Sequence, residues 1–423
     1  MLGCESCIDI GGGTTDISIV QYGDHLEGDG VNLEAELLFR DSSSVAGDTL
    51  TKEIIDCVLL PWLGSRFAAD PGQTSAFENI FKRTDLLPGP KARWSRIVKL
   101  VLLPIVRQWL KDLPRGSFEC PLTGAPWSPD RILGAEGRLV DPGALAEFNQ
   151  FCRESGLKEE LNGIDLLGES DPIMCEPANV AQCIDRVFKP LIFSLAKYVT
   201  AFDVDVVTLS GKPSELPQVK ALLERVLPIL PQRIVQAKDF PAGDWYPMSS
   251  DTRIHDAKSV TAVGAALYQA IYNGRIPRWS IKRLGSGKIG DNYWGSMPAK
   301  VQPDRFGRLY LSPGESEATH PILIGTCIGR KLLPSAAKPE QVYRLRWKDR
   351  DKWVGVPQNA TLHVTLSRVL GAVADETESL KITAVEGNAG GKPVSLDDVE
   401  LQLCTLDGDE FWMDNGRFEV VWP

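Results

Sequence analysis

The sequence predicts an α/β fold in which a lobe of strands and helices is interrupted by a mostly helical insert and followed by a β-rich domain. Apolar residues alternate on both sides of a triglycine in CIDIGGGTTDISIV, residues 7–20, as in two strands joined by a turn. Over 61–190 proline, glycine and tryptophan become frequent and turns separate helical stretches. A strand-to-helix pattern returns over 191–275, and over 276–423 the apolar period is two. The predicted regions are therefore 1–60, 61–190, 191–275 and 276–423.

Length and composition narrow the class of protein. A chain of 423 residues is expected to hold two or three domains, and its 43% hydrophobic and 24% charged residues are typical of a soluble globular protein. The net charge of −10 argues against a general nucleic-acid binder and against attraction to an anionic membrane. Nine scattered cysteines form no disulfide framework, so a reduced, cytoplasmic compartment is expected. Met1–Ser6 has neither the basic nor the apolar region of a signal peptide.

The first region predicts two strands around the glycine turn, a third strand over Leu33–Phe39 and then a helix. Gly47 and Asp48 mark the helix start. An apolar stripe follows at helical spacing, made of Leu50, Ile54, Ile55, Val58 and Leu59.

The insert contains the most apolar window of the chain, Ile97–Leu110. It is short, carries Lys99 and Arg107 and has Pro104 inside, so it predicts a buried, kinked helix rather than a membrane span. A long amphipathic helix is expected over Ala178–Thr200, bent or split at Pro190.

After this helix, Val204–Leu209 reads as a buried strand that ends in a turn. Ser214 is expected to cap the helix that follows. A second helix, rich in small residues, is predicted over Val260–Ile271. Beyond 276, the segments LYL, YRLRW, TLHVTLSRV, SLKITAV, VELQL and FEVVW are strand candidates, and a β-sandwich is expected.

The triglycine turn is the strongest chemical signal. Three glycines between two strands leave backbone N–H groups unobstructed, and such a nest binds phosphate oxygens. Thr14 adds a hydroxyl donor. Asp9, at the end of the incoming strand, can hold a hydrated Mg²⁺, which prefers carboxylate, water and phosphate ligands. A plain glycine-rich hairpin is the alternative reading of the glycines alone. Asp16 is expected to secure the turn.

A second signal is the strand and turn of VVTLSGKPSELP, residues 206–217. A buried strand that ends in a glycine turn and feeds a helix can set the backbone against a nucleoside and point N–H groups at an anion. Many α/β proteins contain such a junction, so this segment is weak evidence by itself.

In this order, with a helical segment between them, the two signals resemble the actin, Hsp70 and sugar-kinase ATPase superfamily, whose lobes have a ribonuclease H-like fold. Residues 9–16 look like its phosphate-2 loop, and 209–217 look like its adenosine motif. Val45–Asp48 resembles the loop that opens the next helix, and 259–271 resembles the closing helix. The resemblance covers about 5–275 and implies ATP or ADP with Mg²⁺. It implies a catalytic and metal-binding role for Asp9, and a nucleotide site made of Gly11, Gly12, Gly13, Thr14, Gly47, Ser210, Gly211, Lys212 and Pro213.

Within that superfamily, two segments look like the virulence-factor SrfB family of bacteria. They are SGKPSELPQVKALLERVLP, from residue 210, and DAKSVTAVGAALYQAI, from residue 256. This resemblance rests on the similarity of these two segments and implies no mechanism by itself.

Two departures from the superfamily pattern bear on activity. Lys212 stands where a second glycine is usual, and Glu215 stands where Hsp70-type members place an arginine against the base. Lys212 would either neutralise phosphate charge or mark a degenerate site. The phosphate-1 loop, D-x-G-T, which belongs to the first lobe, is missing; Ile324-Gly325-Thr326 is the nearest match and has no Asp.

These observations lead to one expected function and two alternatives. The expectation is the C-terminal portion of an ATPase that acts as a conformational switch, completed by a first lobe or a partner protein, with no nucleic acid or membrane as partner. Because in-line geometry needs both lobes, this chain alone is expected to hydrolyse almost no ATP. The alternatives are a non-enzymatic scaffold with a degenerate site and, less favoured, a sugar or acetate kinase.

Overall fold

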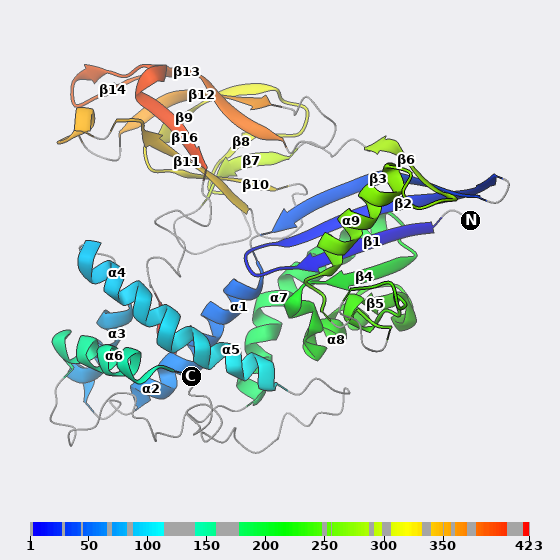
Figure 1. Ribbon diagram of the computed structural model, residues 1–423. Helices are drawn as coiled ribbons and strands as arrows, with labels where there is room; N and C mark the ends of the chain where they lie inside the picture. Colours follow the sequence, from blue (N-terminus) through cyan, green and yellow to red (C-terminus); the bar gives the residue numbers. More distant parts are fainter. Residues whose placement is uncertain are drawn as a thin grey trace.

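The structure of the chain is a computed structural model. It describes residues 3–27, 30–43, 45–65, 70–82, 88–113, 140–157, 177–247, 252–254, 256–286, 292–297, 306–331, 340–349, 351–356, 360–369, 378–403 and 418–422. The fold is mixed α/β with several sheets, as the sequence predicts at this level (Figure 1).

A six-stranded sheet forms the centre of the first part of the chain. Its strand order is β5-β4-β1-β2-β3-β6. The first three strands are an antiparallel meander, β4 and β5 run parallel to β1, and β6 runs parallel to β3. The strands are β1 (Gly3–Ile10), β2 (Thr15–Glu27), β3 (Gly30–Ser43), β4 (Val206–Ser210), β5 (Ile234–Gln236) and β6 (Trp279–Ser286).

The alternation of β1 separates two chemically different faces of this sheet. Ser6, Ile8 and Ile10 are fully buried against helices, whereas Cys7 and Asp9 lie on the opposite face and are only partly buried. The helices on the buried side are α1 (Gly47–Ile54), α7 (Pro177–Ala201) and α8 (Pro217–Val226). Helix α9 (Val260–Tyr272) crosses the polar face (Figure 1).

The predicted helix over 178–200 is present as α7, which continues through Pro190 as one element. Helix α8 begins only at Pro217, and its N-cap is Leu216. The predicted cap by Ser214 is wrong, because Ser214 lies in a 3₁₀ turn, η5 (Lys212–Glu215), and its hydroxyl donates to the carbonyl of Gly211 at 2.6 Å.

The helical region shares one hydrophobic core with the sheet. Its bulkiest buried side chains are aromatic, and they pack with the apolar stripe of α1. Its elements are η1 (Ile55–Leu59), α2 (Leu60–Gly64), α3 (Pro71–Lys82), α4 (Pro88–Ile97), η3 (Val98–Leu102), α5 (Leu103–Asp112) and α6 (Pro142–Glu154). The insert is therefore continuous with the lobe and has no separate core in the described residues.

Two single-turn π-helices, η1 and η3, interrupt the helices of this region, and each lies just before a proline. Proline lacks an N–H and crowds the carbonyl four residues earlier, so a wider turn accommodates Pro61 and Pro104 without ending the helix. The predicted kinked helix over 97–110 is thus α4, η3 and α5, and its apolar side is buried. Among the described residues no helix is both long and apolar enough to cross a membrane.

The β-rich domain encloses a second core between two sheets. One sheet has the order β16-β11-β10-β7-β8 and the other β13-β12-β9, and Trp294, Leu345 and Val364 are among the buried residues between them. The strands are β7 (Tyr293–Ser296), β8 (Leu309–Leu311), β9 (Glu317–Leu323), β10 (Cys327–Lys331), β11 (Glu340–Trp347), β12 (Thr361–Val369), β13 (Ser379–Glu386), β14 (Asn388–Ala389), β15 (Lys392–Pro393) and β16 (Val399–Leu403). The short 3₁₀ turns of the chain are η6 (Pro231–Arg233), η7 (Ala237–Asp239), η8 (Asp351–Trp353) and η9 (Leu396–Asp398).

Two segments after residue 276 lie outside this β-rich domain. Strand β6 joins the central sheet beside β3. The segment 418–422, predicted as a strand, is not one; it lies against the helical region. There the Phe418 amide donates to the Phe81 carbonyl at 2.8 Å, and the Val421 amide donates to the Asp56 carbonyl at 3.0 Å. Phe418 is 1% exposed and completes the first core.

Candidate functional site

The triglycine turn joins the end of β1 to the start of β2, on the side of the central sheet where α1 begins. The pairing of the two strands runs up to Ile10 and Thr15, so the turn is confined to residues 11–14. The Gly11 amide donates to the Thr14 carbonyl at 2.8 Å, which closes the turn on itself. A Cβ on Gly11 would lie 3.0 Å from that carbonyl oxygen, so the tight closure favours glycine.

Backbone amides at the N-terminus of α1 donate hydrogen bonds to two further carbonyls of the turn. The Gly47 amide donates to the Gly11 carbonyl at 3.0 Å, and the Asp48 amide donates to the Gly12 carbonyl at 2.7 Å. The Thr15 hydroxyl adds a bond of 2.7 Å to the Val45 carbonyl. The first amides of α1 are therefore used to fix the turn rather than to bind an anion directly.

The remaining amides of the turn are open. Within the described part of the chain, those of Gly12, Gly13 and Thr14 have no hydrogen-bond partner. Gly12 and Thr14 are exposed, so a ligand can reach these donors from solvent. The Thr14 hydroxyl donates to the Asp16 carboxylate at 3.0 Å, in agreement with Asp16 securing the turn.

The second glycine turn, which follows β4, lies directly against the first. Gly211 has φ +79° and ψ 154°, a combination that only glycine adopts without strain. A Cβ there would lie 2.0 Å from the Ile10 carbonyl oxygen and 2.6 Å from an Asp9 carboxylate oxygen. On the other side, the Pro213 ring lies 3.0 Å from where a Gly47 Cβ would be. The structure thus brings together the segments around Asp9, Gly11, Gly47 and Gly211, which the sequence analysis singled out.

Asp9 lies beside the second turn on the polar face of the sheet. Burial raises the pKa of its carboxyl, and the Asp16 carboxylate adds to this effect. Hydrogen bonds with Ser210 at the end of β4 and with Thr261 of α9 oppose the rise. A cation bound here would stabilise the ionised carboxylate against both unfavourable effects, its burial and its repulsion by Asp16.

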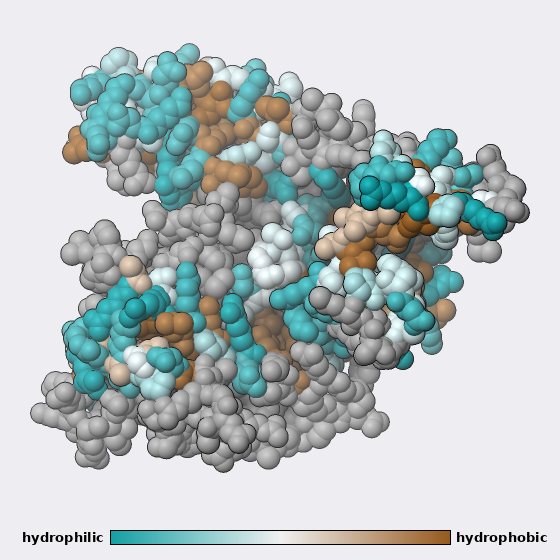
Figure 2. Space-filling model, in the orientation of Figure 1, coloured by the Kyte–Doolittle hydropathy of each residue, from teal (hydrophilic) through white to brown (hydrophobic). Residues whose placement is uncertain are grey.

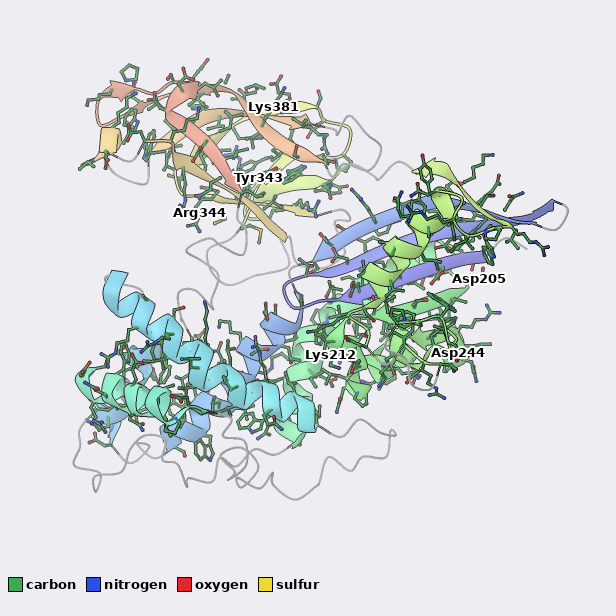
Figure 3. The ribbon with its side chains drawn as sticks, viewed as in Figure 1. Asp205, Lys212, Asp244, Tyr343, Arg344 and Lys381 are labelled. Carbon is green, nitrogen blue, oxygen red and sulfur yellow. The ribbon has the colours of Figure 1, made fainter. Side chains whose placement is uncertain are left out.

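Lys212 is bound within its own turn. Its ammonium lies 2.9 Å and 2.7 Å from the two carboxylate oxygens of Glu215, whose side chain is 4% exposed. The Ser214 carbonyl accepts a bond of 2.7 Å from Gln236. Figure 3 shows Lys212 at the end of β4 nearest α1, whereas Asp205 lies at the opposite end of that strand. The charge of Lys212 is therefore directed at Glu215.

A polar cavity of about 400 Å³ opens on the Asp9 face, and the β-rich domain forms its opposite wall. Arg330 of β10 reaches across to the central sheet, where its guanidinium lies 3.2 Å from the Ser42 hydroxyl and 4.0 Å from the Asp41 carboxylate. Sequence reasoning missed this wall, since no motif marks Arg330. The cavity is lined by Asp9, Asp16, Arg40, Asn292, Arg330 and Glu378, among others.

The donor set fits a phosphate-bound Mg²⁺ better than a metal held by the protein alone. In the described residues no group of three or more His, Cys, Asp and Glu side chains is placed to hold a metal ion. The partly buried carboxylate of Asp9 next to open amides instead matches the habit of Mg²⁺, which uses one or two carboxylates together with water and phosphate oxygens.

The comparisons with known proteins identify the family. A model of the virulence factor SrfB family matches residues 5–419. The chain belongs to the SrfB family. The match covers both the central sheet and the β-rich domain of this SrfB chain, so the facing walls of the polar cavity lie within one family sequence. A search of curated proteins found no match.

Proposed function

We propose that residues 3–275 of this SrfB chain form the second lobe of an actin/Hsp70-like ATP-binding fold. The antiparallel meander extended by β4 and β5, with helices on both faces, is compatible with such a lobe. The meeting of the two glycine turns at the start of α1 supports the assignment, because the superfamily resemblance requires those segments to share one site.

In this proposal each residue of the site has a distinct task. The amides of Gly12, Gly13 and Thr14 bind the terminal phosphates of ATP or ADP. Asp9 holds Mg²⁺, which neutralises phosphate charge when bound. Gly11 and Gly47 shape the turn. Gly211 allows the backbone after β4 to approach Asp9, with Ser210 and Pro213 on either side.

The observation that carries the proposal is the set of three open amides beside a partly buried carboxylate. A backbone donor that is held in place by its neighbours but has no partner is ready for an anion. The glycine turn of an ordinary hairpin needs neither the clamp by α1 nor the carboxylate of Asp9.

The proposed role is a nucleotide-dependent switch. Binding of nucleotide would bias the position of α1 and α9 relative to the sheet, and a partner protein or a first lobe would complete the site for hydrolysis. This chain alone would then bind nucleotide weakly and turn over a negligible amount of ATP.

The test is a thermal-shift and calorimetric titration of the full chain with Mg-ADP and Mg-ATP. Binding to the folded state alone raises its stability, by about 2.7 kcal/mol at a hundredfold excess over Kd. Asp9→Asn should weaken the Mg²⁺-dependent part of binding at least tenfold, whereas the exposed Asp397→Asn in η9 should not. No binding at millimolar nucleotide by a folded chain would overturn the proposal.

A scaffold with a degenerate nucleoside site is the second candidate. The closed Lys212–Glu215 pair favours it, because this pair occupies the turn in which the superfamily receives the nucleoside. The same titration separates the two candidates if inorganic phosphate and tripolyphosphate are added as ligands. A scaffold binds none of these, whereas a phosphate site without base recognition binds tripolyphosphate and ATP alike.

A further inference from the structure

A pair of thiols lies in the helical region, away from the two glycine turns. Cys57 is in the π-helical turn η1, and Cys183 is in α7, which packs against η1. The Cys57 thiol donates to the Glu53 carboxylate at 3.3 Å, and the Cys183 thiol lies 3.9 Å from the Glu53 carbonyl, so both thiols contact one residue. The two thiols are also close enough to shift each other's pKa. Both cysteines are free thiols, so the two sulfurs are neighbours that are not bonded to each other.

An arginine lies against one of the two sulfurs. A guanidinium nitrogen of Arg186 is 3.0 Å from the Cys57 sulfur and 2.6 Å from the Glu53 carboxylate. The hydrogen bond from Cys183 and, to a smaller degree, the charge of Arg186 lower the pKa of Cys57, against burial and the Glu53 carboxylate. The pKa of Cys183 is raised, because it donates to Cys57 and is itself buried.

The two cysteines also differ in access. Cys57 is partly exposed and Cys183 is buried. The side chain of Arg186 is 54% exposed, so the Arg186 side of Cys57 faces solvent. A small oxidant can therefore reach Cys57 from solvent, whereas Cys183 is buried next to it.

We propose that Cys57 and Cys183 form a peroxide-reactive thiol pair in which Cys57 is oxidised and Cys183 closes a reversible disulfide between η1 and α7. A thiol that is close to an arginine, accessible and next to a second thiol has the arrangement expected of a redox-sensitive site.

The chemistry balances with hydrogen peroxide as the oxidant. The Cys57 thiolate attacks one peroxide oxygen, the O–O bond breaks, and the leaving hydroxide takes a proton to form water. Sulfur is oxidised by two electrons to sulfenic acid. The Cys183 sulfur then attacks the Cys57 sulfur, the S–O bond breaks, and a second water leaves with the Cys183 proton. The first step removes the Cys57 negative charge, so the charge that opposed ionisation of Cys183 is gone when Cys183 must react.

The disulfide would fasten α7 to the helix that starts at the phosphate-facing turn. Helix α1 begins at Gly47, which holds the Gly11 carbonyl, and continues without a break into η1 and Cys57. Oxidation would therefore restrain the far end of the same helix. This effect does not depend on whether the glycine turn binds nucleotide.

The experiment treats the folded full chain with hydrogen peroxide, blocks remaining thiols with an alkylating agent and maps peptides without reduction. The expected product is a cross-linked peptide pair that contains Cys57 and Cys183, which dithiothreitol cleaves. In Cys183→Ser, dimedone should label Cys57 as sulfenic acid. Arg186→Gln should slow oxidation of Cys57 by roughly three- to tenfold, and Arg186→Lys should restore part of the rate.

Two controls keep the test sharp. Cys152 is fully buried and its raised pKa keeps it protonated, so it should react far more slowly than Cys57. Cys327 also contacts an arginine, since its sulfur is 3.1 Å from the Arg344 guanidinium, and Cys327→Ser should leave the yield of the Cys57–Cys183 link unchanged. Oxidation of Cys57 no faster than that of Cys152, or a folded wild-type chain without the cross-link, would overturn the proposal.

Discussion

The two glycine turns that meet at the start of α1 differ in how they satisfy their own polar groups. The turn at Gly11–Thr14 uses its carbonyls on α1 and leaves three amides open. The turn at Gly211–Glu215 is closed: the Ser214 hydroxyl bonds to the Gly211 carbonyl, and Lys212 bonds to Glu215. One turn is therefore free to take an anion, whereas the other is already occupied by its own side chains. If the site binds nucleotide as proposed, this contrast makes the Gly11–Thr14 turn the part that contacts it.

The largest expected effect comes from filling the closed turn at its tightest point. Gly211→Ala puts a methyl group 2.0 Å from the Ile10 carbonyl oxygen and forces a backbone conformation that only glycine tolerates. We expect a loss of about 4 kcal/mol or more in the free energy of unfolding, measured by urea denaturation. Gly274→Ala is a matched control, because its φ is also positive but no atom lies within 4 Å of the added Cβ. A loss no larger than in that control would contradict the close contact between the two turns.

A smaller effect is expected from opening the Lys212–Glu215 pair. Lys212→Ala removes a charge partner of a carboxylate that is 4% exposed, but the ammonium itself is 45% exposed and screened. The expected loss is therefore about 1 kcal/mol, and Lys212→Ala combined with Glu215→Gln should recover part of it. If Lys212→Ala instead weakens nucleotide binding without changing stability, Lys212 serves phosphate and the second turn is not closed.

A pH-dependent effect is expected at Asp9, beside the open turn. Its pKa is raised in the folded state, so its contribution to stability is complete below the unfolded pKa and is lost as pH rises through the folded pKa. Asp9→Asn should therefore gain stability relative to the wild type as pH rises above the unfolded pKa of an aspartate, about 3.9. Urea unfolding of both chains at several pH values checks this sign, and an unchanged difference would show that Asp9 is not under strain from burial and Asp16.

The smallest effect is expected within the open turn itself. A Cβ on Gly12 would meet only the Asp48 carboxylate, at an ordinary contact distance of 3.8 Å, and Gly12 is not among the described glycines with positive φ. Gly12→Ala should change the free energy of unfolding by less than about 1 kcal/mol, with stabilisation as the expected sign. A large loss by thermal or urea unfolding would mean that this turn is as tightly closed as the one at Gly211.

The sequence predicts the parts of the fold that depend on local pattern. Alternation identifies β1 and β2, helical spacing identifies α7, and the buried run before Ser210 identifies β4. Sequence separation explains what was missed. Strand β6 is recognised only by its pairing with β3, about 250 residues earlier, and 418–422 reads as a strand until the helices that receive it are known.

The candidate site follows the same division. The sequence reveals the triglycine and Gly211 because tight turns and close backbone contacts require glycine. It reveals Asp9 because a carboxylate at the end of a strand next to such a turn is a recognisable pattern. The closure of Lys212 on Glu215 depends on rotamers that spacing does not determine. Arg330 carries no signal at all, because its position beside Asp41 results from how the β-rich domain sits on the sheet (Figure 1). Figure 2 shows apolar residues of α9 at the surface. Tyr268 and Tyr272 of the same helix are 42% and 69% exposed, which the sequence pattern of a helix rich in small residues does not predict.

The segment 418–422 has a mechanical consequence for the β-rich domain. The chain enters this domain from β6, which is anchored in the central sheet, and returns from it to Asp56 and Phe81 among the helices. A domain that is attached to the rest of the molecule at two separate places has far less rotational freedom than one attached at a single place.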